Sequence, residues 1–342
     1  MQREEIVERL TPFLRQRLGA DRLQIDGVRS LTGGAVRETW LLEVTGEAPG
    51  QAAQARRLVL LAFRPDPRRA FSPENEFRLL EKVHQAGVPV PRPFLLGDES
   101  VLGQAFYLSE FVPGETIGRR LVKEPRFESA RVRLAAELAG ALATIHRVAL
   151  DPDALGFLPG PPPHASLIEH ELATLEAVYR QMTLEPHPAF ELALRWLARN
   201  APARGERVLV HGDYRIGNVI VDESGLRAVL DWELAHVGDP LEDLGWMCVR
   251  SWRFGMDHRP VGGIGEREEF YRAYEDASGR RIDRGAARFW EVYGNLRWGI
   301  FTLVQLRAFT DGLSRSVELA SIGRRTAETE WELLNLLEGE AY

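Results

Sequence analysis

The segment from Leu209 to Pro240, LVHGDYRIGNVIVDESGLRAVLDWELAHVGDP, places charged residues directly after short apolar runs. One run precedes His-Gly-Asp and another precedes Asp-Trp-Glu, and a Ser-Gly turn separates two brief strand-like stretches. This spacing allows a loop and a hairpin to bring Asp213, Asn218 and Asp231 to one point. Oxygen ligands of this kind suit magnesium, and one carboxylate can accept or orient a hydroxyl group.

A simpler explanation exists for each of these residues. Asp213 and Asn218 can be turn residues, and Asp231 and Glu233 can cap a loop, because short polar side chains hydrogen-bond nearby backbone groups. For any one of them alone we would favour that explanation. Their combination with a glycine pair upstream favours a functional site in which several groups converge.

Length and composition limit the class of protein. A chain of 342 residues exceeds what one hydrophobic core usually organises, so we expect two lobes or domains. With 44% hydrophobic and 27% charged residues, the chain can bury a core. Cys248 is the only cysteine, which excludes an intrachain disulfide and a cysteine metal cluster and predicts a reducing, cytoplasmic location.

The expected partner is a small molecule. The charged N-terminal segment lacks the apolar core of a signal peptide, and no stretch reaches the ~18 apolar residues of a membrane span. We therefore expect no membrane partner. A net charge of -7 and a pI near 5.7 argue against a nucleic-acid binder, whose footprint is basic. The oligomeric state cannot be read from the chain.

Periodicity predicts a sheet followed by helices. An amphipathic helix ends at Gly19, and strand-like stretches follow at 31–44 and 56–65. A helix begins near Pro73 and stops at Gly87, before a proline-rich connection at 88–93 and a further strand at 104–112. A long buried helix is predicted at 127–148, and most of the second half is helical.

The motifs resemble the catalytic core of the aminoglycoside phosphotransferase and choline kinase families, which share the protein-kinase fold. HGDYRIGN resembles their catalytic loop, LDWELAHVGDPLEDLG their metal-binding segment, and PENEFRLLEKVHQAGVPVPRP with FYLSEFVPGE their helix-to-hinge region. The resemblance covers most of the chain. It implies an α+β, two-lobed protein-kinase-like fold, with a nucleotide-binding lobe at 1–112, a hinge at about 110–113 and a helical catalytic lobe at 113–342.

The same resemblance implies ATP and magnesium as cofactors and assigns roles to individual residues. Asp213 would be the catalytic aspartate, and Asn218 and Asp231 would bind magnesium. Glu76 would be the helix glutamate that normally pairs with a strand lysine. Arg215 would carry charge near the γ-phosphate, where its planar fork suits phosphate; the alternative is a surface arginine on a turn.

Further residues would bind the nucleotide. The hinge residues expected to read the adenine through backbone groups are Glu110, Phe111 and Val112. The turn expected to cover the phosphates consists of Thr32, Gly33 and Gly34. Glycine permits the close backbone approach that a Cβ atom would block. By itself, a two-glycine hairpin is more often only a turn.

One departure from the resembling families concerns the third strand. Kinases carry a lysine there, and relatives often an arginine, but this chain has Leu61. We prefer Arg64 as the replacement, although its side chain has the opposite parity and needs a bulge or a shifted register. The alternative is that Arg64 is a solvated charge at the strand end.

Several other polar and aromatic residues have structural interpretations. Asp239 and Asp243 are expected to brace a loop of the site, and His211 to anchor the catalytic loop. His146 is expected to be a hydrogen-bonded core histidine. Most of a group of tryptophans should be core residues, and some could line an acceptor pocket: Trp232, Trp246, Trp252, Trp290 and Trp298.

The sequence predicts a small-molecule kinase that transfers a γ-phosphoryl group to a hydroxyl acceptor. One alternative, motivated by Leu61, is a kinase-like module that binds nucleotide with little turnover. A protein kinase is disfavoured, because the Ala-Pro-Glu that ends its activation segment is missing. An aminoglycoside or other antibiotic kinase is the remaining alternative.

The acceptor prediction depends on charge and on a second resemblance. Ten arginines and eight carboxylates lie between residues 250 and 300, in a chain that is acidic overall. Polycationic aminoglycosides need an acidic pocket, so an anionic or neutral acceptor fits better. GDPLEDLGW and EFYRAYEDASGRRID resemble kinase-like domains found beside or fused to acyl-CoA dehydrogenases, which implies a hydroxyacyl acceptor.

Overall fold

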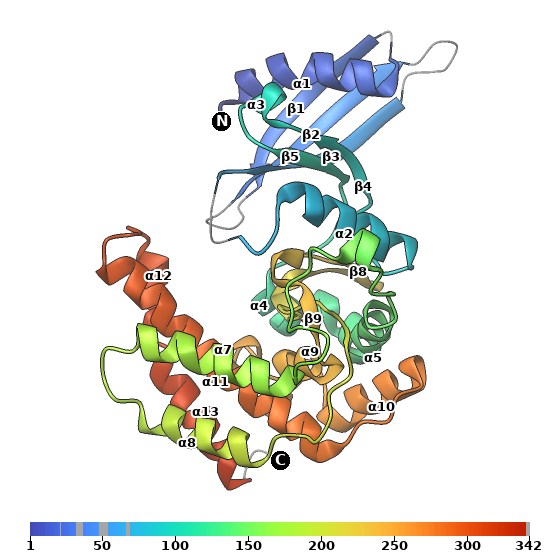
Figure 1. The fold of residues 1–342 in the computed structure, drawn as a ribbon. Helices are drawn as coiled ribbons and strands as arrows, with labels where there is room; N and C mark the ends of the chain where they lie inside the picture. The colour runs from blue at the N-terminus through green and yellow to red at the C-terminus, as the bar shows by residue number, and fades with distance from the viewer. Residues whose placement is uncertain (21, 32–36, 48–53, 66–68, 340–342) are drawn as a thin grey trace. The chain divides into compact units, whose positions relative to one another are not determined.

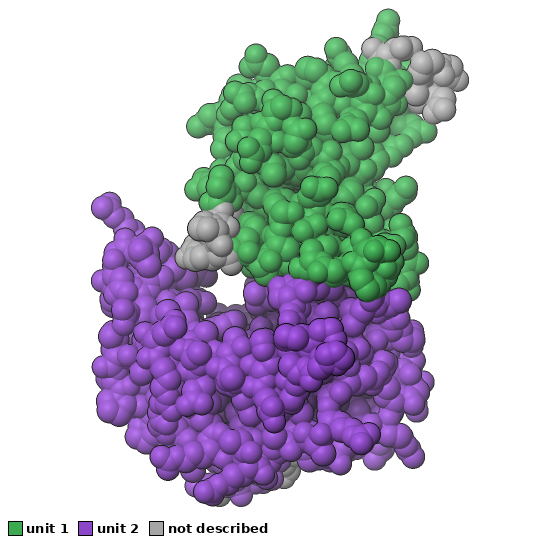
Figure 2. Space-filling view, viewed as in Figure 1, with its two compact units in different colours: residues 1–114, 151–157, 227–233 green, residues 115–150, 158–226, 234–342 purple. Residues whose placement is uncertain are grey.

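The computed structural model describes residues 1–20, 22–31, 37–47, 54–65 and 69–339. The chain forms two compact units (Figure 2). The first consists of residues 1–114, 151–157 and 227–233, and the second of residues 115–150, 158–226 and 234–342.

A five-stranded antiparallel sheet forms the centre of the first unit, with the strand order β1-β2-β3-β5-β4 (Figure 1). Its strands are β1 (Arg22–Leu31), β2 (Arg37–Glu47), β3 (Gln54–Phe63), β4 (Pro93–Gly97) and β5 (Phe106–Glu110). The predicted sheet is confirmed, and it has a further strand, β4, which begins at Pro93, where the predicted proline-rich connection ends. Because β4 is an edge strand, the sheet tolerates the missing N–H of Pro93.

The helices of this unit are α1 (Arg3–Leu18), α2 (Pro73–Gln85), α3 (Glu99–Leu102) and α6 (Pro152–Leu155). α1 packs on β1 and α2 on β4 and β5, while α3 contacts α1 and α6 contacts α2. As predicted, α1 ends at Gly19, which adopts a left-handed φ of 57°. The predicted start of α2 is also confirmed. Ser72 caps it by accepting a hydrogen bond from the N–H of Asn75 at 3.2 Å, and proline occupies the first helical position.

The two faces of the sheet have different environments. Under α1, one face buries the β3 residues Leu58, Leu60 and Ala62. Side chains of the opposite parity project from the other face, because successive residues of a strand alternate. The register pairs Leu61 with Thr39 on β2 and with Tyr107 on β5. These three therefore share the face covered by α2, whose Phe77 ring lies 5.8 Å from that of Tyr107.

The second unit is mainly helical, as predicted. Its helices are α4 (Gly118–Lys123), α5 (Glu128–Ile145), α7 (Leu167–Met182), α8 (Pro188–Arg199), α9 (Pro240–Met247), α10 (Arg267–Ser278), α11 (Arg284–Thr310), α12 (Val317–Gly323) and α13 (Thr326–Glu338). One hydrophobic core of this unit lies between α7, α8, α11 and α13, around Phe190, Trp290 and Leu333. In the described ranges, no helix is both long and apolar enough to cross a membrane.

Short strands and turns frame the segment at 209–240. β6 (Val208–Val210) pairs with β9 (His236–Gly238), and β7 (Val219–Asp222) pairs with β8 (Gly225–Val229), which confirms the predicted strands around the Ser-Gly turn. The 3-10 turns are η1 (Pro125–Phe127), η2 (Ile216–Asn218), η3 (Trp232–Leu234) and η4 (Arg250–Trp252). Asp213 thus follows β6, and Asp231 follows β8.

Candidate active site

A buried carboxylate on α9 holds the loop that contains Asp213. Asp243 accepts hydrogen bonds from the backbone N–H groups of His211 at 2.8 Å and Gly212 at 2.9 Å. Burial by itself would raise the pKa of Asp243, but the hydrogen bond and charge of His146 outweigh it and hold the pKa below its usual value. The carboxylate is therefore charged, and its predicted bracing role is confirmed.

The two histidines predicted to be structural, His146 and His211, both form hydrogen bonds. His146 contacts Asp243 Oδ2 through Nε2 at 3.1 Å and the Tyr274 hydroxyl through Nδ1 at 2.8 Å. The Nδ1 atom of His211 accepts a hydrogen bond from the backbone N–H of Asp213 at 3.2 Å. Both side chains stabilise the loop, which confirms the predictions made for them.

Asp239 has a related but different position. Its carboxylate caps α9 by accepting a hydrogen bond from Leu241 N–H at 2.9 Å, and it also accepts one from Glu206 N–H at 3.0 Å. Burial raises the pKa of Asp239 to about 6. The residue thus connects α9 to the segment before β6, on the flank of the catalytic loop.

Gly212 is required by the local geometry of the loop. Its φ of 79° lies in the left-handed region. A Cβ atom here would lie 2.3 Å from the carbonyl oxygen of Leu234 and 3.2 Å from Nδ1 of His236. The loop therefore packs against the β9 segment at a distance that only glycine allows.

Three side chains converge on the carboxylate of Asp213. Oδ1 accepts hydrogen bonds from Arg215 Nε at 3.1 Å and Trp246 Nε1 at 2.8 Å, and Oδ2 accepts one from Asn218 Nδ2. Asn218 Nδ2 also donates to the backbone carbonyl of Asp213 at 2.9 Å. Donors on both oxygens fix the orientation of the carboxylate. The side chain remains 19% exposed, so a substrate hydroxyl can reach it.

Sequence reasoning missed the contact made by Trp246. The indole is buried on α9, its ring lies 5.1 Å from that of Trp252, and Trp252 lies beneath the Arg215 guanidinium at 5.4 Å. A usable signal was the spacing from Asp243. Residues three apart share one face of a helix, so the helix that braces the loop also presents Trp246 to it.

Glu76 forms a second buried cluster, which lies in the first unit. Its Oε1 accepts a hydrogen bond from the Tyr107 hydroxyl at 2.8 Å and lies 3.4 Å from Arg37 Nη1, and its Oε2 lies 3.8 Å from Arg69 Nη1. Arg37 also forms an ion pair with Asp231 through Nη2. Burial raises the pKa of Glu76, against the lowering effect of Arg37 and Tyr107.

The placement of Arg64 corrects the preferred prediction. Arg64 contacts Glu38 at 2.8 Å, and its side chain is 68% exposed. Glu38 also binds the N-terminal amine at the start of α1, on the face opposite to Glu76. β2 and β3 pair without a register shift from Gly46 to Arg37, so the bulge that would redirect Arg64 does not occur there. Arg64 is thus the strand-end charge of the alternative, and Arg37 and Arg69 accompany Glu76.

The predicted magnesium ligands, Asn218 and Asp231, both carry oxygen atoms that can bind a cation. The hydrogen bonds of Asn218 to Asp213 use Nδ2 and leave Oδ1, the atom that can bind a cation, out of these bonds. Asp231 adopts a left-handed φ of 63°, unusual for a non-glycine residue, and its side chain is 35% exposed. Among the described residues, no group of three or more His, Cys, Asp or Glu could hold a metal by itself. Each of the two side chains carries oxygen atoms that suit magnesium, which is usually bound by few protein oxygens together with waters and substrate phosphates.

The predicted hinge has fewer free backbone donors than expected. Glu110 N–H donates to the carbonyl of Arg92 at 2.9 Å, and Phe111 N–H donates to that of Arg57 at 3.0 Å. The N–H group of Val112 takes part in neither bond. Of the three predicted hinge residues, Val112 is therefore the one whose N–H group can donate to the adenine.

The predicted phosphate-covering turn, Thr32, Gly33 and Gly34, lies outside the described residues.

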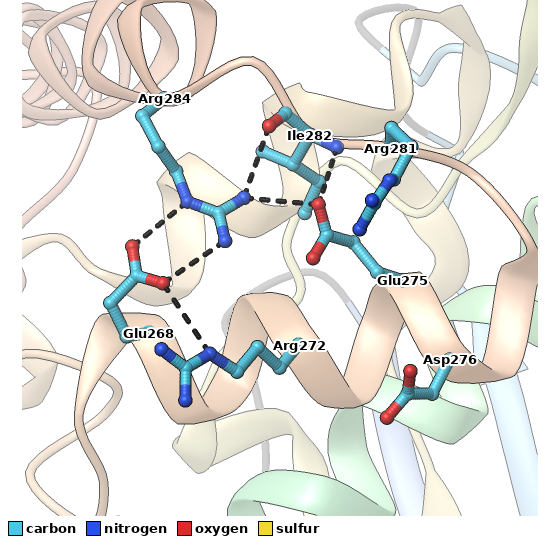
Figure 3. A pocket seen from close by; sticks show the side chains of 7 residues that line it. All are labelled: Glu268, Arg272, Glu275, Asp276, Arg281, Ile282 and Arg284. Atoms are coloured by element: carbon cyan, nitrogen blue, oxygen red, sulfur yellow. Dashed lines mark hydrogen bonds and ion pairs between the residues drawn. The ribbon is translucent and has the colours of Figure 1, made fainter.

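A separate hollow in the second unit is rich in charge (Figure 3). It is lined by Glu268, Arg272, Glu275, Asp276, Arg281, Ile282 and Arg284. Arg284 contacts Glu268 at 2.8 Å and Glu275 at 3.2 Å. These opposite charges largely pair with one another, so the hollow lacks the excess of negative charge that a polycation would need.

Other arginines between residues 250 and 300 pair with carboxylates outside that window. Arg253 contacts Glu332 at 2.9 Å, and Arg280 contacts Glu206 at 2.7 Å. Arg297 contacts Glu242 at 2.9 Å and is largely buried. The positive balance counted along the sequence is therefore offset by the tertiary structure, and by itself it does not create a basic acceptor surface.

Comparison with curated proteins finds relatives that are similar in sequence to part of this chain. Acyl-CoA dehydrogenase family member 10 of Mus musculus is 33% identical over 183 residues, which cover 52% of this chain and 16% of that protein. The probable acyl-CoA dehydrogenase IBR3 of Arabidopsis thaliana is 28% identical over 294 residues, 77% of this chain and 34% of that protein. The chain thus matches about a third or less of each relative's length.

Solved structures share the fold over nearly the whole chain. A putative aminoglycoside phosphotransferase from Ralstonia eutropha is 26% identical, with a TM-score of 0.72 and coverage of 95% of this chain and 97% of that one. The GDP and kanamycin complex of an aminoglycoside 2″-phosphotransferase is 17% identical, with a TM-score of 0.65 and coverage of 94% and 98%. These matches confirm the α+β protein-kinase-like fold.

The sequence profile of the phosphotransferase enzyme family matches residues 27–290, which include β2, α2 and the loops that carry Asp213 and Asp231. This chain therefore belongs to the phosphotransferase enzyme family.

Proposed function

We propose that this protein transfers the γ-phosphoryl group of ATP to a hydroxyl group of a small molecule, in a magnesium-dependent reaction. The observation that carries the proposal is the carboxylate of Asp213, partly exposed and oriented by Asn218, Arg215 and Trp246. A phosphotransferase needs a carboxylate of this kind to orient the acceptor and accept its proton. A chain that only bound nucleotide would not require it.

Each residue then has one role. Asp213 accepts the hydroxyl proton as the acceptor oxygen bonds to the γ-phosphorus and the bond to the β-phosphate oxygen breaks, which releases ADP. Arg215 lies beside Asp213 and would stabilise charge on the transferred group. The N–H of Val112 would contribute to binding the adenine. Solved relatives bear GDP, ADP or AMP-PNP, which supports a nucleotide donor.

Asn218 and Asp231 would hold the magnesium ion. The ion would neutralise phosphate charge, which is its general contribution in phosphoryl transfer. Asn218 would contribute its amide oxygen, while its nitrogen remains bonded to Asp213. The Asn218 side chain would thereby couple the orientation of the catalytic carboxylate to metal binding.

For the acceptor, we propose a hydroxylated acyl compound. The curated relatives are named as acyl-CoA dehydrogenase family members, which supports an acyl compound as the substrate of an accompanying kinase segment. The paired carboxylates of the charged hollow offer little to a polycation. The alternative acceptor is an aminoglycoside, supported by the fold of a kanamycin complex.

Steady-state assays of ADP release with magnesium-ATP would test this proposal. Candidate acceptors are hydroxyacyl-CoA esters, choline and kanamycin-type aminoglycosides, and Asp213→Asn is the matched inactive control. We expect turnover of a hydroxyacyl ester that the variant lacks. Turnover of aminoglycosides alone would overturn the acceptor assignment. Equal rates for the two proteins would overturn the role of Asp213.

A further inference from the structure

A phosphotransferase of this fold needs a cation for the α- and β-phosphates, anchored by the helix glutamate. In resembling kinases this cation is on the third strand, where this chain has Leu61, and Arg64 points to the opposite face and pairs with Glu38. Glu76 nevertheless lies buried in the expected cluster. The structure therefore keeps the anchor while the usual cation is missing from its strand.

The register of β2 and β3 shows which residue takes its place. Thr39 pairs with Leu61, and Arg37 pairs with Phe63. Cross-strand partners project from the same face, as do residues two apart on one strand. Arg37 and Leu61 are thus diagonal neighbours on the face toward α2, and a long side chain bridges such a separation.

The contacts of Arg37 match the required position. One guanidinium nitrogen lies 3.4 Å from Glu76 Oε1, and the other forms an ion pair with Asp231, the proposed magnesium ligand. A kinase brings these two carboxylates to the phosphates through a cation and a metal. The side chain of Arg37 is only 15% exposed, so its orientation is fixed by these partners.

Arg69 is the competing cation. It lies 3.8 Å from Glu76 Oε2, and its guanidinium is stacked over the Phe63 ring at 4.5 Å. No ion pair joins it to Asp231 among those the structure records in the described ranges. Arg69 is therefore placed to support Glu76, whereas Arg37 contacts both carboxylates.

We propose that Arg37 of β2 binds the nucleotide phosphates in place of the third-strand lysine or arginine, a role that rests on the proposed use of ATP. In this chain the cation lies on the neighbouring strand, on the same face of the sheet as Leu61. Its planar fork can contact Glu76 and a phosphate oxygen together, which a lysine cannot do in the same way.

Binding measurements on the whole chain would test this role. We expect Arg37→Ala to weaken binding of magnesium-ATP by roughly 10- to 100-fold, because a charged hydrogen bond is lost, and to leave adenosine binding unchanged. Arg64→Ala is the matched control, with both affinities unchanged. Arg37→Ala combined with Leu61→Lys should recover much of the lost affinity, because the cation returns to the third strand.

The possible outcomes separate this role from the proposed function. Unchanged magnesium-ATP binding by Arg37→Ala would overturn the role of Arg37, even in an enzyme that turns over. Normal nucleotide binding without turnover of any acceptor would overturn the proposed function and leave the binding result valid. Loss of adenosine binding would show that Arg37→Ala does not fold. Arg37→Gln, which keeps a hydrogen-bond donor toward Glu76, would then be tested in its place, and unchanged magnesium-ATP binding by this variant would overturn the role of Arg37.

Discussion

The indole N–H of Trp246 donates a hydrogen bond to Oδ1 of Asp213 at 2.8 Å, from a helix that begins 27 residues after the aspartate in sequence. The same helix carries Asp243, which binds the backbone of the loop. One helix therefore fixes both the path of the catalytic loop and the orientation of its carboxylate. This arrangement makes the effect of small changes around Asp213 predictable.

Replacing Asp213 by asparagine should abolish phosphoryl transfer and leave nucleotide binding nearly intact. The amide keeps the shape of the carboxylate but cannot accept the hydroxyl proton, and general-base catalysis contributes roughly 10²- to 10⁴-fold. Acceptor-dependent ADP release and the thermal shift with magnesium-ATP would be measured on both proteins. A variant that retains wild-type kcat would contradict the assignment.

Replacing Trp246 by phenylalanine should lower kcat about tenfold, because the aromatic packing is kept while a hydrogen bond to a charged group is lost. The KM for magnesium-ATP should not change, since the indole contacts the catalytic carboxylate of Asp213. Trp298→Phe is a matched control, because its ring packs in the same aromatic cluster without a hydrogen bond to Asp213. A change in KM alone would indicate a purely structural effect.

Replacing Asp231 by alanine should remove most of the magnesium-dependent stabilisation by ATP. A ligand at 100 times its Kd stabilises a protein by about 2.7 kcal/mol, so the loss is measurable as a thermal shift. The shift would be compared with and without magnesium. An equal magnesium-dependent shift in both proteins would exclude Asp231 as a metal ligand. Asp222→Ala, at the end of β7, is a control that removes a carboxylate elsewhere in the hairpin.

The stability of the protein should fall between about pH 6.5 and pH 9 because of His236. Burial lowers the pKa of His236, but Glu242, 3.0 Å from Nε2, outweighs this effect and raises the pKa to about 9. Nδ1 faces the carbonyl of Leu234 at 2.9 Å, so both nitrogens face acceptors, as the charged form requires. A raised pKa stabilises the folded state fully below the unfolded value of 6.5, and this stabilisation is lost as the pH rises to 9.

This contribution amounts to between about 3 and 4 kcal/mol at most, since each pKa unit corresponds to about 1.4 kcal/mol. Urea unfolding at several pH values would measure it, with His236→Asn expected to flatten the dependence and the exposed His84→Asn expected to keep it. Asp239 does not interfere, because its raised pKa of about 6 costs stability only as the pH rises from 3.8 to 6. A slope that persists in His236→Asn would contradict the assignment.

Much of the fold follows from local patterns along the chain. The capped start of α2 at Pro73, the glycine end of α1 and the strands around the Ser-Gly turn depend on residues close in sequence. Periodicity and capping chemistry act over a few residues, which is why they can be read without a structure. The strand at Pro93 was missed for the same reason, because proline is disfavoured in strands except at an edge, and the edge is a property of the assembled sheet.

The spacing of Asp213, Asn218 and Asp231 indicated a phosphotransferase from the sequence alone, since polar residues after apolar runs in one short segment are a local signal. Which side chains serve them was decided by the tertiary structure. Arg37 meets Glu76 across 39 residues, and Trp246 meets Asp213 across 33. Strand register and helix packing create such contacts, because side-chain direction alternates with every residue and partners are chosen by burial rather than by spacing. For this reason the sequence could only predict that a cation lies near Leu61. The assembled sheet shows that Arg37, and not Arg64, lies on the same face as Leu61.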